Sequence, residues 1–280
     1  MVLRPLTTRA ALLLSTASAA LLVSGCQTQA QETQPAPETK PTQKSKTPPP
    51  GSIQPVLPTT PKSDKERAAE PPKSYKPVTI SLGERAPDEV AELFNTAMKK
   101  VAVPPPPADF SVPAHPRVEF DTCKGKMVLE LDATKAPLTV KSFVYLASKG
   151  FYKNTTFNKR SDITGDKKGY IIQGGDPLSS NPRTSRFAGM GGPGYAVPLE
   201  ISDLKHDQFV IGAVRNNHPD SAGSQFYITQ GAPHFFDGQH TVFGKIVDGK
   251  DVAAKLDLGD TLIAVKVLDA STPEDAPKTP

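Results

Sequence analysis

The sequence predicts a mainly β protein, in which a closed antiparallel β-barrel capped by two α-helices follows a disordered, proline-rich spacer. From residue 117 onward, many short apolar runs alternate with glycine-rich turns, and only two helical patterns interrupt them. The spacer follows from composition, because 11 of the 30 prolines fall between Gln27 and Lys76 and the only aromatic residue there is Tyr75. Such a stretch buries too little apolar surface to offset the entropy lost on ordering.

The N-terminal residues have the pattern of an export signal. Two arginines precede an apolar or small stretch over residues 10–23, and these 14 residues are too short to cross a hydrocarbon core of roughly 30 Å. The ending Ser24-Gly25-Cys26 resembles the lipobox of bacterial lipoproteins, in which the cysteine carries the lipid. We therefore predict a signal peptide over residues 1–25 and a lipidated Cys26. An ordinary cleaved signal that happens to contain a cysteine is the alternative.

Four further segments follow the signal. We predict a disordered spacer over residues 26–76, a helical and proline-rich extension over 77–116, the folded domain over 117–270, and a disordered tail over 271–280. In the extension, Pro87 precedes Val90, Leu93, Phe94 and Ala97, which recur with helical spacing. This pattern predicts a short amphipathic helix that ends before Pro104 and packs on the main domain or on a partner.

The folded domain begins with strands. Residues 126–131 alternate, with Met127, Leu129 and Leu131 on one face, which predicts a strand. Pro137 begins a helix with one apolar face, and Gly150 ends it. Further strands are predicted near residues 170–173, 209–214, 225–229, 241–246 and 262–268, with a helix over residues 250–256.

Charge, cysteines and missing motifs exclude several classes of function. The net charge is only +4 and the positive charges do not cluster, so nucleic acid is not the expected partner. Two cysteines, Cys26 and Cys123, are too few for a disulfide framework or a zinc site unless they pair with each other. The chain has no G-x-S-x-G, H-E-x-x-H or P-loop motif, and the spacing of His234 and His240 suits no simple metal site. We expect no metal and no cofactor.

Polar and aromatic residues on two predicted strands point to a common surface. Strand alternation places Gln225, Tyr227 and Thr229 on one face, and it likewise places Ile171 and Gln173 together. An apolar surface with a few amide groups suits a peptide better than a charged metabolite.

Four ordered motifs then carry a resemblance to a known family. They are Ile172-Gln173-Gly174-Gly175-Asp176-Pro177, Gly191-Gly192-Pro193-Gly194-Tyr195, Gly223-Ser224-Gln225-Phe226-Tyr227-Ile228, and Phe236-Asp237-Gly238-Gln239-His240-Thr241-Val242-Phe243-Gly244. With them, residues 118–268 resemble a cyclophilin, the β-barrel family of peptidyl-prolyl cis/trans isomerases. The resemblance covers a little over half of the chain and does not extend to the signal, the spacer or the helix near Val90.

The resemblance implies a set of site residues. Those implied to bind substrate are Tyr170, Ile171, Asn216, Gln225, Tyr227, Phe235, Phe236 and His240, with Asn216 holding the substrate backbone. Gln173 is implied to act with the catalytic arginine of the family.

The catalytic arginine itself has two candidates here. In the family it stands two residues after a phenylalanine, and the matching segment reads Phe157-Asn158-Lys159-Arg160, followed by an insertion over residues 161–168. Counting selects Lys159. Chemistry favours Arg160, because a guanidinium held as a planar fork by Gln173 can donate toward the prolyl nitrogen, whereas a lysine offers no fixed fork. We predict Arg160, with Lys159 as the alternative.

These observations predict a lipid-anchored peptidyl-prolyl cis/trans isomerase that assists the folding of exported proteins at the bacterial cell envelope. Its partners would be proline-containing polypeptides and the membrane, through the lipid on Cys26, and the protein would be a monomer. The alternative is a proline-peptide binding module or chaperone with weak or no isomerase activity. The choice between Lys159 and Arg160 leaves that alternative open.

Overall fold

The computed structural model describes residues 74–82, 86–163, 165 and 170–268. The predicted signal, Cys26, almost all of the spacer, the tail and much of the 161–168 insertion lie outside these residues.

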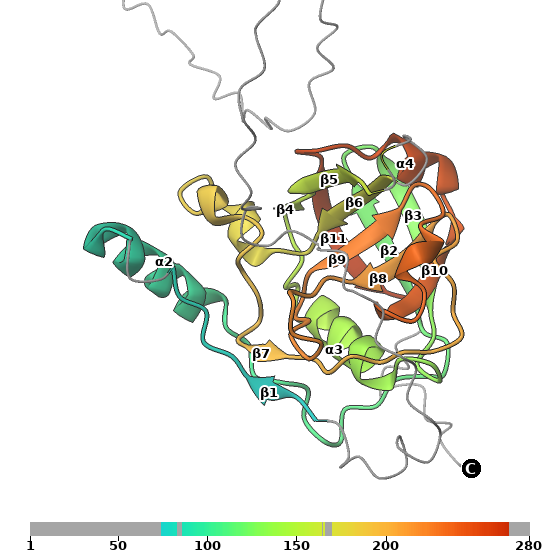
Figure 1. The fold of residues 1–280 in the computed structure, drawn as a ribbon, viewed down its shortest axis with the longest axis horizontal. Helices are drawn as coiled ribbons and strands as arrows, with labels where there is room; N and C mark the ends of the chain where they lie inside the picture. Colours follow the sequence, from blue (N-terminus) through green and yellow to red (C-terminus); the bar gives the residue numbers. More distant parts are fainter. Residues whose placement is uncertain (1–73, 83–85, 164, 166–169, 269–280) are drawn as a thin grey trace, which may run out of the picture.

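One curled antiparallel sheet forms the body of the molecule, as Figure 1 shows. The strand order is β4-β11-β2-β3-β10-β8-β9-β6-β5. The bounds are β2 Arg117–Thr122, β3 Gly125–Leu131, β4 Thr155–Thr156, β5 Lys159–Asp162, β6 Tyr170–Gly174, β8 Val210–Ala213, β9 Phe226–Thr229, β10 Val242–Asp248 and β11 Thr261–Val267. Strands β3, β6, β8, β9, β10 and β11 lie where the sequence predicts them, and β2 lies at the predicted start of the folded domain. Strand β5, the two-residue strands and three short 3₁₀ helices were not predicted.

The predicted closed barrel is not confirmed. In the described part of the chain, the ladder ends at β4 on one side and at β5 on the other, with no pairing between them. The two edges are nevertheless consecutive in sequence, because only Phe157 and Asn158 separate them. The Phe157 amide donates to the Asp260 carbonyl (2.8 Å) and the Asn158 amide donates to the Gln173 carbonyl (3.0 Å). These residues therefore bridge the gap between the edges of a half-barrel.

The core fills the inside of this curl. Phe120 on β2 and Phe226 on β9 are almost fully buried, and both rings contact Phe143 of α3 (Pro137–Ser148). The first turn of α3 has no side-chain cap of its own, so Glu200 provides one from a distant loop. Its carboxylate accepts from the amides of Leu138 (2.9 Å) and Thr139 (2.8 Å). The second predicted helix is α4, Lys250–Lys255.

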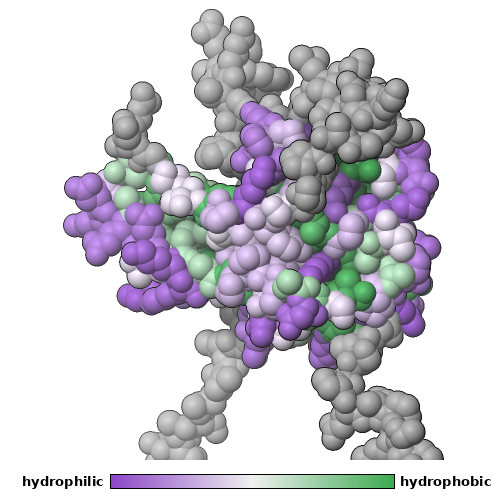
Figure 2. Space-filling view, turned by 90° about the horizontal axis from the view of Figure 1, so that it is seen from below, coloured by the Kyte–Doolittle hydropathy of each residue, from purple (hydrophilic) through white to green (hydrophobic). Residues whose placement is uncertain are grey.

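An N-terminal segment extends this body on one side. Strand β1 (Lys76–Pro77) pairs with β7 (Tyr195–Ala196), and helix α2 (Asp88–Val101) packs against the 3₁₀ helices η1 (Pro177–Ser180) and η2 (Ser185–Phe187). The predicted amphipathic helix is therefore present, and it packs on the main domain. Figure 2 shows hydrophilic residues over the outer side of the lobe that α2 forms.

Candidate active site

A second apolar cluster lies on the sheet face opposite the main core. It consists of Ile171 from β6, Val214, Tyr227 from β9, and Phe236 from η3 (His234–Phe236), and we call it the outer cluster. Because side chains alternate along a strand, Ile172 and Ile228 point into the core while their neighbours Ile171 and Tyr227 point outward. The outer cluster therefore gathers residues that the sequence placed on one surface.

A row of amides borders the outer cluster. Gln173 lies opposite Tyr227 in the ladder, and its Nε2 donates to Gln225 Oε1 (2.8 Å). Gln225 Nε2 in turn donates to the carbonyls of Gly189 (3.1 Å) and Gly191 (2.8 Å). The Oε1 atom of Gln173 is buried and has no hydrogen-bond partner among the described residues. An orphaned acceptor of this kind costs free energy and marks a place where a ligand or a mobile side chain completes the network.

The strand register decides which basic residue faces these amides. Strands β5 and β6 pair Lys159 with Gln173 and Arg160 with Ile172. Side chains of paired residues share a face, so Lys159 lies on the face of Gln173 and the outer cluster. Lys159 is half-buried, and burial lowers the pKa of its amine. In the described residues no carboxylate pairs with it.

Arg160 lies on the other face, so the predicted contact with Gln173 is wrong. Its Nε donates to Gln230 Oε1 (3.2 Å) and lies 3.8 Å from Asp257 Oδ1. Its guanidinium also stacks over the Tyr170 ring at 4.2 Å. No bulge turns Arg160 back toward Gln173, because the four β5–β6 pairs run without a register shift.

Tyr170 lies on the same face of the sheet as Arg160. It starts β6 opposite Asp162, one position before Ile171, and alternation turns it away from the outer cluster toward the guanidinium. The structure therefore does not bring Tyr170 together with the other implied substrate-binding residues.

His240 completes the outer cluster. It is 4% exposed, and its ring lies 4.5 Å from Phe236 and 6.3 Å from Tyr227. Neither ring nitrogen has a hydrogen-bond partner among the described residues. Burial, followed by the charges of Arg215 and His206, lowers its pKa to about 3, so the ring is neutral at physiological pH.

Phe235 and Asn216 stand at the rim. Phe235 is 42% exposed and packs edge-on against Phe236 at 4.6 Å, which carries apolar surface from the buried cluster out to solvent. Asn216 is exposed. Its backbone N–H donates to Ser221 Oγ (3.0 Å), and its backbone carbonyl accepts from Arg215 Nη1 (2.9 Å). Its backbone is thus already held in place before any substrate binds.

Sequence reasoning missed two buried groups that hold this site. Arg215 is 7% exposed, and its guanidinium donates to the carbonyls of Asn216 and of Gln239, the residue before His240. His206 accepts or donates between Tyr227 Oη (2.8 Å) and Asp237 Oδ1 (2.9 Å), which ties β9 to η3. The sequence offered little to find them by: Arg215 is adjacent to the implied site residue Asn216, and His206 lies in a segment between predicted strands.

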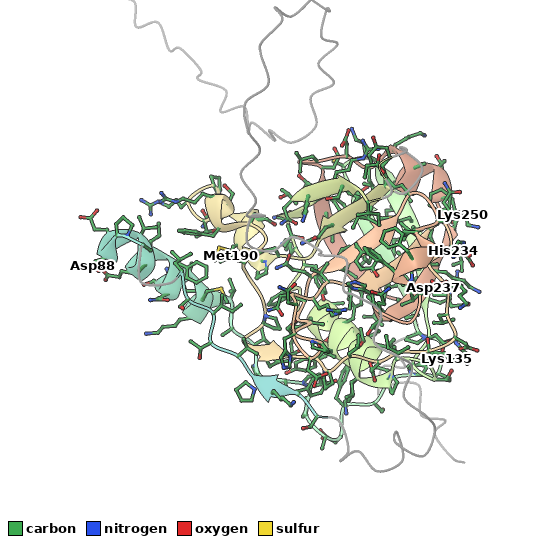
Figure 3. All side chains as sticks on the ribbon, in the orientation of Figure 1. Asp88, Lys135, Met190, His234, Asp237 and Lys250 are labelled. Atoms are coloured by element: carbon green, nitrogen blue, oxygen red, sulfur yellow. The ribbon has the colours of Figure 1, made fainter. Side chains whose placement is uncertain are left out.

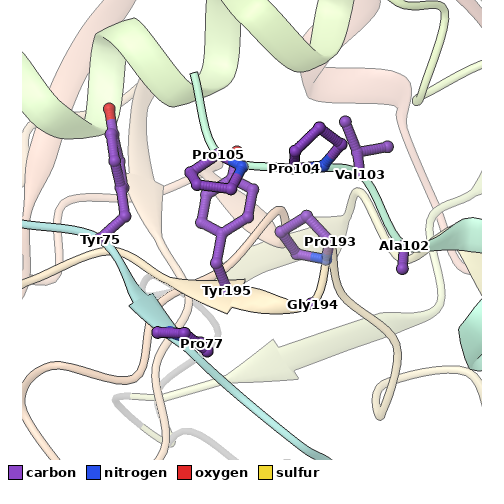
Figure 4. Close-up of a pocket in the computed structure, with 9 residues that line it drawn as sticks. All are labelled: Tyr75, Pro77, Ala102, Val103, Pro104, Pro105, Pro193, Gly194 and Tyr195. Carbon is purple, nitrogen blue, oxygen red and sulfur yellow. The ribbon is translucent and has the colours of Figure 1, made fainter. Parts of the chain in front are cut away.

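Other candidate sites lie elsewhere or do not form. In the described residues, no three His, Cys, Asp or Glu side chains gather closely enough to hold a metal ion. Likewise no helix among them has the length and apolar character to cross a bilayer. A cavity of about 440 Å³ lies between the N-terminal segment and β7, lined by tyrosines and prolines (Figure 4). None of its lining residues belongs to the outer cluster or to the amide row.

Comparison with known families agrees with this geometry. The model of the cyclophilin type peptidyl-prolyl cis-trans isomerase family matches residues 117–272, which contain every element of the site. The chain belongs to this family. As a cyclophilin it is an isomerase. The match to the family begins where β2 begins, so β1 and α2 lie outside the matched residues.

Curated relatives and a solved cyclophilin structure each match about half of this chain. Peptidyl-prolyl cis-trans isomerase-like 1 of Emericella nidulans is 34% identical over 56% of this chain and 94% of its own length. The Mus musculus protein of the same name is 35% identical over 52% and 82%. This chain spans only 23% of isomerase-like 2 of Rhizopus delemar, at 38% identity. A Cryptosporidium parvum cyclophilin structure is 29% identical, with a TM-score of 0.48, over 57% of this chain and 99% of that one.

Proposed function

We propose that this cyclophilin isomerises Xaa-Pro bonds in exported polypeptides at the cell envelope, held there by a lipid on Cys26. Its membership of the family supports the reaction, and the apolar N-terminal stretch ending in Cys26 supports the location. Several acyl chains on one N-terminus give stable anchoring, where a single chain would be marginal.

The reaction needs no covalent chemistry. Amide resonance gives the Xaa-Pro bond a rotation barrier of about 18–20 kcal/mol, and spontaneous exchange takes tens of seconds or longer. A catalyst lowers that barrier by binding the twisted amide more tightly than the planar one. The rim ring of Phe235 and the buried outer cluster supply apolar surface for the proline, while a cation beside the cluster donates toward the prolyl nitrogen once resonance is lost.

We infer that the cation is Lys159. The observation that carries this is the β5–β6 register, which places Lys159 on the face of Gln173 and turns Arg160 toward Gln230 and Asp257. A lysine lacks the planar fork of an arginine, so it needs a separate acceptor to hold it. The orphaned Oε1 of Gln173 is an acceptor on the same face of the same strand pair.

Isomerisation of an Ala-Pro peptide, coupled to a protease that cleaves only the trans form, tests the reaction. The mature chain should accelerate exchange well above the blank, and a rate equal to the blank would contradict the proposal. Location is tested separately by Cys26→Ser, which should move the protein from the membrane to the soluble fraction. Unchanged membrane retention would overturn the lipid anchor and leave the reaction unaffected.

A proline-peptide binding module with weak turnover is the second candidate. The observation that favours it is that the cation on the outer-cluster face is a lysine, which stabilises the twisted amide less specifically than a guanidinium. Under this reading the protein binds Ala-Pro peptides, as seen by titration calorimetry, but its kcat/KM stays near the blank.

A further inference from the structure

The N-terminal segment contacts a loop next to the site, on the side of the loop that faces away from the site. We call residues 188–194 the wall loop, and residues 75–82 with 86–103 the clasp. The Val78 amide donates to the Gly194 carbonyl (3.0 Å), and the Val103 amide donates to the Pro193 carbonyl (2.9 Å). Figure 4 shows Pro193, Gly194 and Tyr195 between the two arms of the clasp, one carrying Pro77 and the other Val103. The wall loop is therefore hydrogen-bonded by both arms of the clasp.

Helix α2 closes the clasp through an apolar cluster of its own. Phe94 is fully buried, and its ring meets Phe187 edge-on at 5.2 Å. Leu178 and Met190 belong to the same cluster. Met190 lies between α2 and the sheet, as Figure 3 shows, and it is part of the wall loop itself. Packing of α2 therefore bears directly on the position of this loop.

The opposite side of the wall loop faces the site. Buried Asp176 accepts from the amides of Gly189 and Gly191, which fixes the direction of the loop backbone. The carbonyls of the same two glycines accept from Gln225 Nε2. The loop thus connects the clasp on one side to the amide row on the other.

The two carbonyls determine which way the amides point. Because they engage the NH₂ group of Gln225, its Oε1 must face Gln173 and accept from Nε2. Among the described residues, the Gln173 oxygen then has no hydrogen-bond partner, and it lies on the face that carries Lys159. If the carbonyls turned away, both amides could rotate by half a turn, and Gln173 would present NH₂ to an ammonium group. Two donors repel, so Lys159 would face a donor where the present arrangement offers it an acceptor.

We propose that the clasp is a positioning element of the active site, which acts through the wall loop and Gln225 to keep the oxygen of Gln173 directed toward Lys159. The inference rests on the proposed function for its catalytic consequence, but its structural part stands on contacts alone. The clasp lies outside the residues that match the family, so it would be a device of this chain rather than of the shared domain.

The test compares two neighbouring residues of α2 in the mature chain. Phe94→Ala removes the buried ring, and Asn95→Ala, at an exposed position of the same helix, is the matched control. Phe94→Ala should lower kcat/KM by three- to ten-fold, and Asn95→Ala should leave it unchanged. In a Gln225→Ala background, Phe94→Ala should have no further effect, because the connection is already cut. An equal effect in both backgrounds would overturn the proposal.

A second variant and a second readout keep the test independent of activity and of helix unfolding. Val103→Pro removes one amide donor to the wall loop, and the preceding residue, Ala102, is already extended as proline requires. Both Phe94→Ala and Val103→Pro should shift the side-chain amide signals of Gln225 and Gln173 in nitrogen–proton NMR spectra, while Asn95→Ala should not. Unshifted signals would overturn the clasp even in an active enzyme. Shifted signals in an inactive protein would uphold it while the proposed function fails.

Discussion

The two faces of the sheet around β6 and β9 are equally buried but differ in what their polar atoms contact. The inner face holds Ile172, Phe226 and Ile228 in a continuous apolar core. The outer face holds Ile171 and Tyr227. Beside them, the Oε1 of Gln173 and both ring nitrogens of His240 have no hydrogen-bond partner within the described part of the chain, whereas the core there has one such atom, Tyr152 Oη. A face built only for stability would satisfy these groups, so the difference marks the outer face as the one built to bind.

The largest effect is expected from the inner face. Phe120→Ala empties a fully buried site that contacts Phe143 and Phe226, and should cost about 3–5 kcal/mol of unfolding free energy. Urea denaturation measures this loss. The kcat/KM of the protein that remains folded should change by less than about two-fold. A ten-fold fall would contradict the conclusion that the inner face serves stability and the outer face serves binding.

Acid should act through the outer face. Folding lowers the pKa of His240 to about 3 and lowers that of His206 through burial, so below about 6.5 the unfolded chain binds protons that the folded protein does not. The free energy of unfolding should therefore fall as the pH drops below 6.5, by roughly 1.4 kcal/mol per pH unit from His240, and His206 contributes in the same direction.

Denaturation at pH 7 and pH 5 measures this effect. His240→Gln is the control and should make the pH dependence shallower. An unchanged dependence in that variant would show that His240 does not carry the effect. Because the ring stays neutral, kcat/KM should show no step near pH 6.5.

Much of this picture could be predicted from local sequence pattern. Alternation predicted the strand over residues 126–131 and the common face of Gln225 and Tyr227, and helical spacing predicted α2. The site motifs identified Ile171, Gln173, Phe236 and His240, which the structure brings together.

The rest depends on pairing between distant segments. Whether Lys159 or Arg160 faces Gln173 depends on the β5–β6 register across an insertion, and a shift of one residue reverses the answer. The contacts of His206 with Tyr227 and Asp237 join segments 21 and 31 residues apart, and no local pattern announces them. The clasp, likewise, shows in the sequence only as an amphipathic helix with an unknown partner.

The two basic residues give the sharpest test of the two faces. Lys159→Ala should lower kcat/KM by ten-fold or more, about 1.4 kcal/mol of transition-state stabilisation, because it removes the cation on the outer-cluster face. Arg160→Ala, the matched control, should change kcat/KM by less than about two-fold, since its contacts are with Gln230, Asp257 and Tyr170. The opposite order would restore Arg160 as the catalytic cation. If neither variant changes kcat/KM, the result would favour the binding module.

The smallest effect is expected at the rim of the outer face. Phe235 is 42% exposed and packs edge-on against Phe236 of the cluster, so Phe235→Ala leaves no buried cavity and should shift the thermal midpoint by at most a degree or two. It does remove apolar surface that a bound proline would cover, and this contact is equally available to the planar and twisted amide. Binding lost equally from both states raises KM and leaves kcat unchanged, so we expect KM to rise about two- to three-fold. Leu258→Ala, at a 62% exposed position outside the site, should change neither quantity. A fall in kcat at constant KM would instead place Phe235 against the twisted amide itself and extend the catalytic surface to the rim.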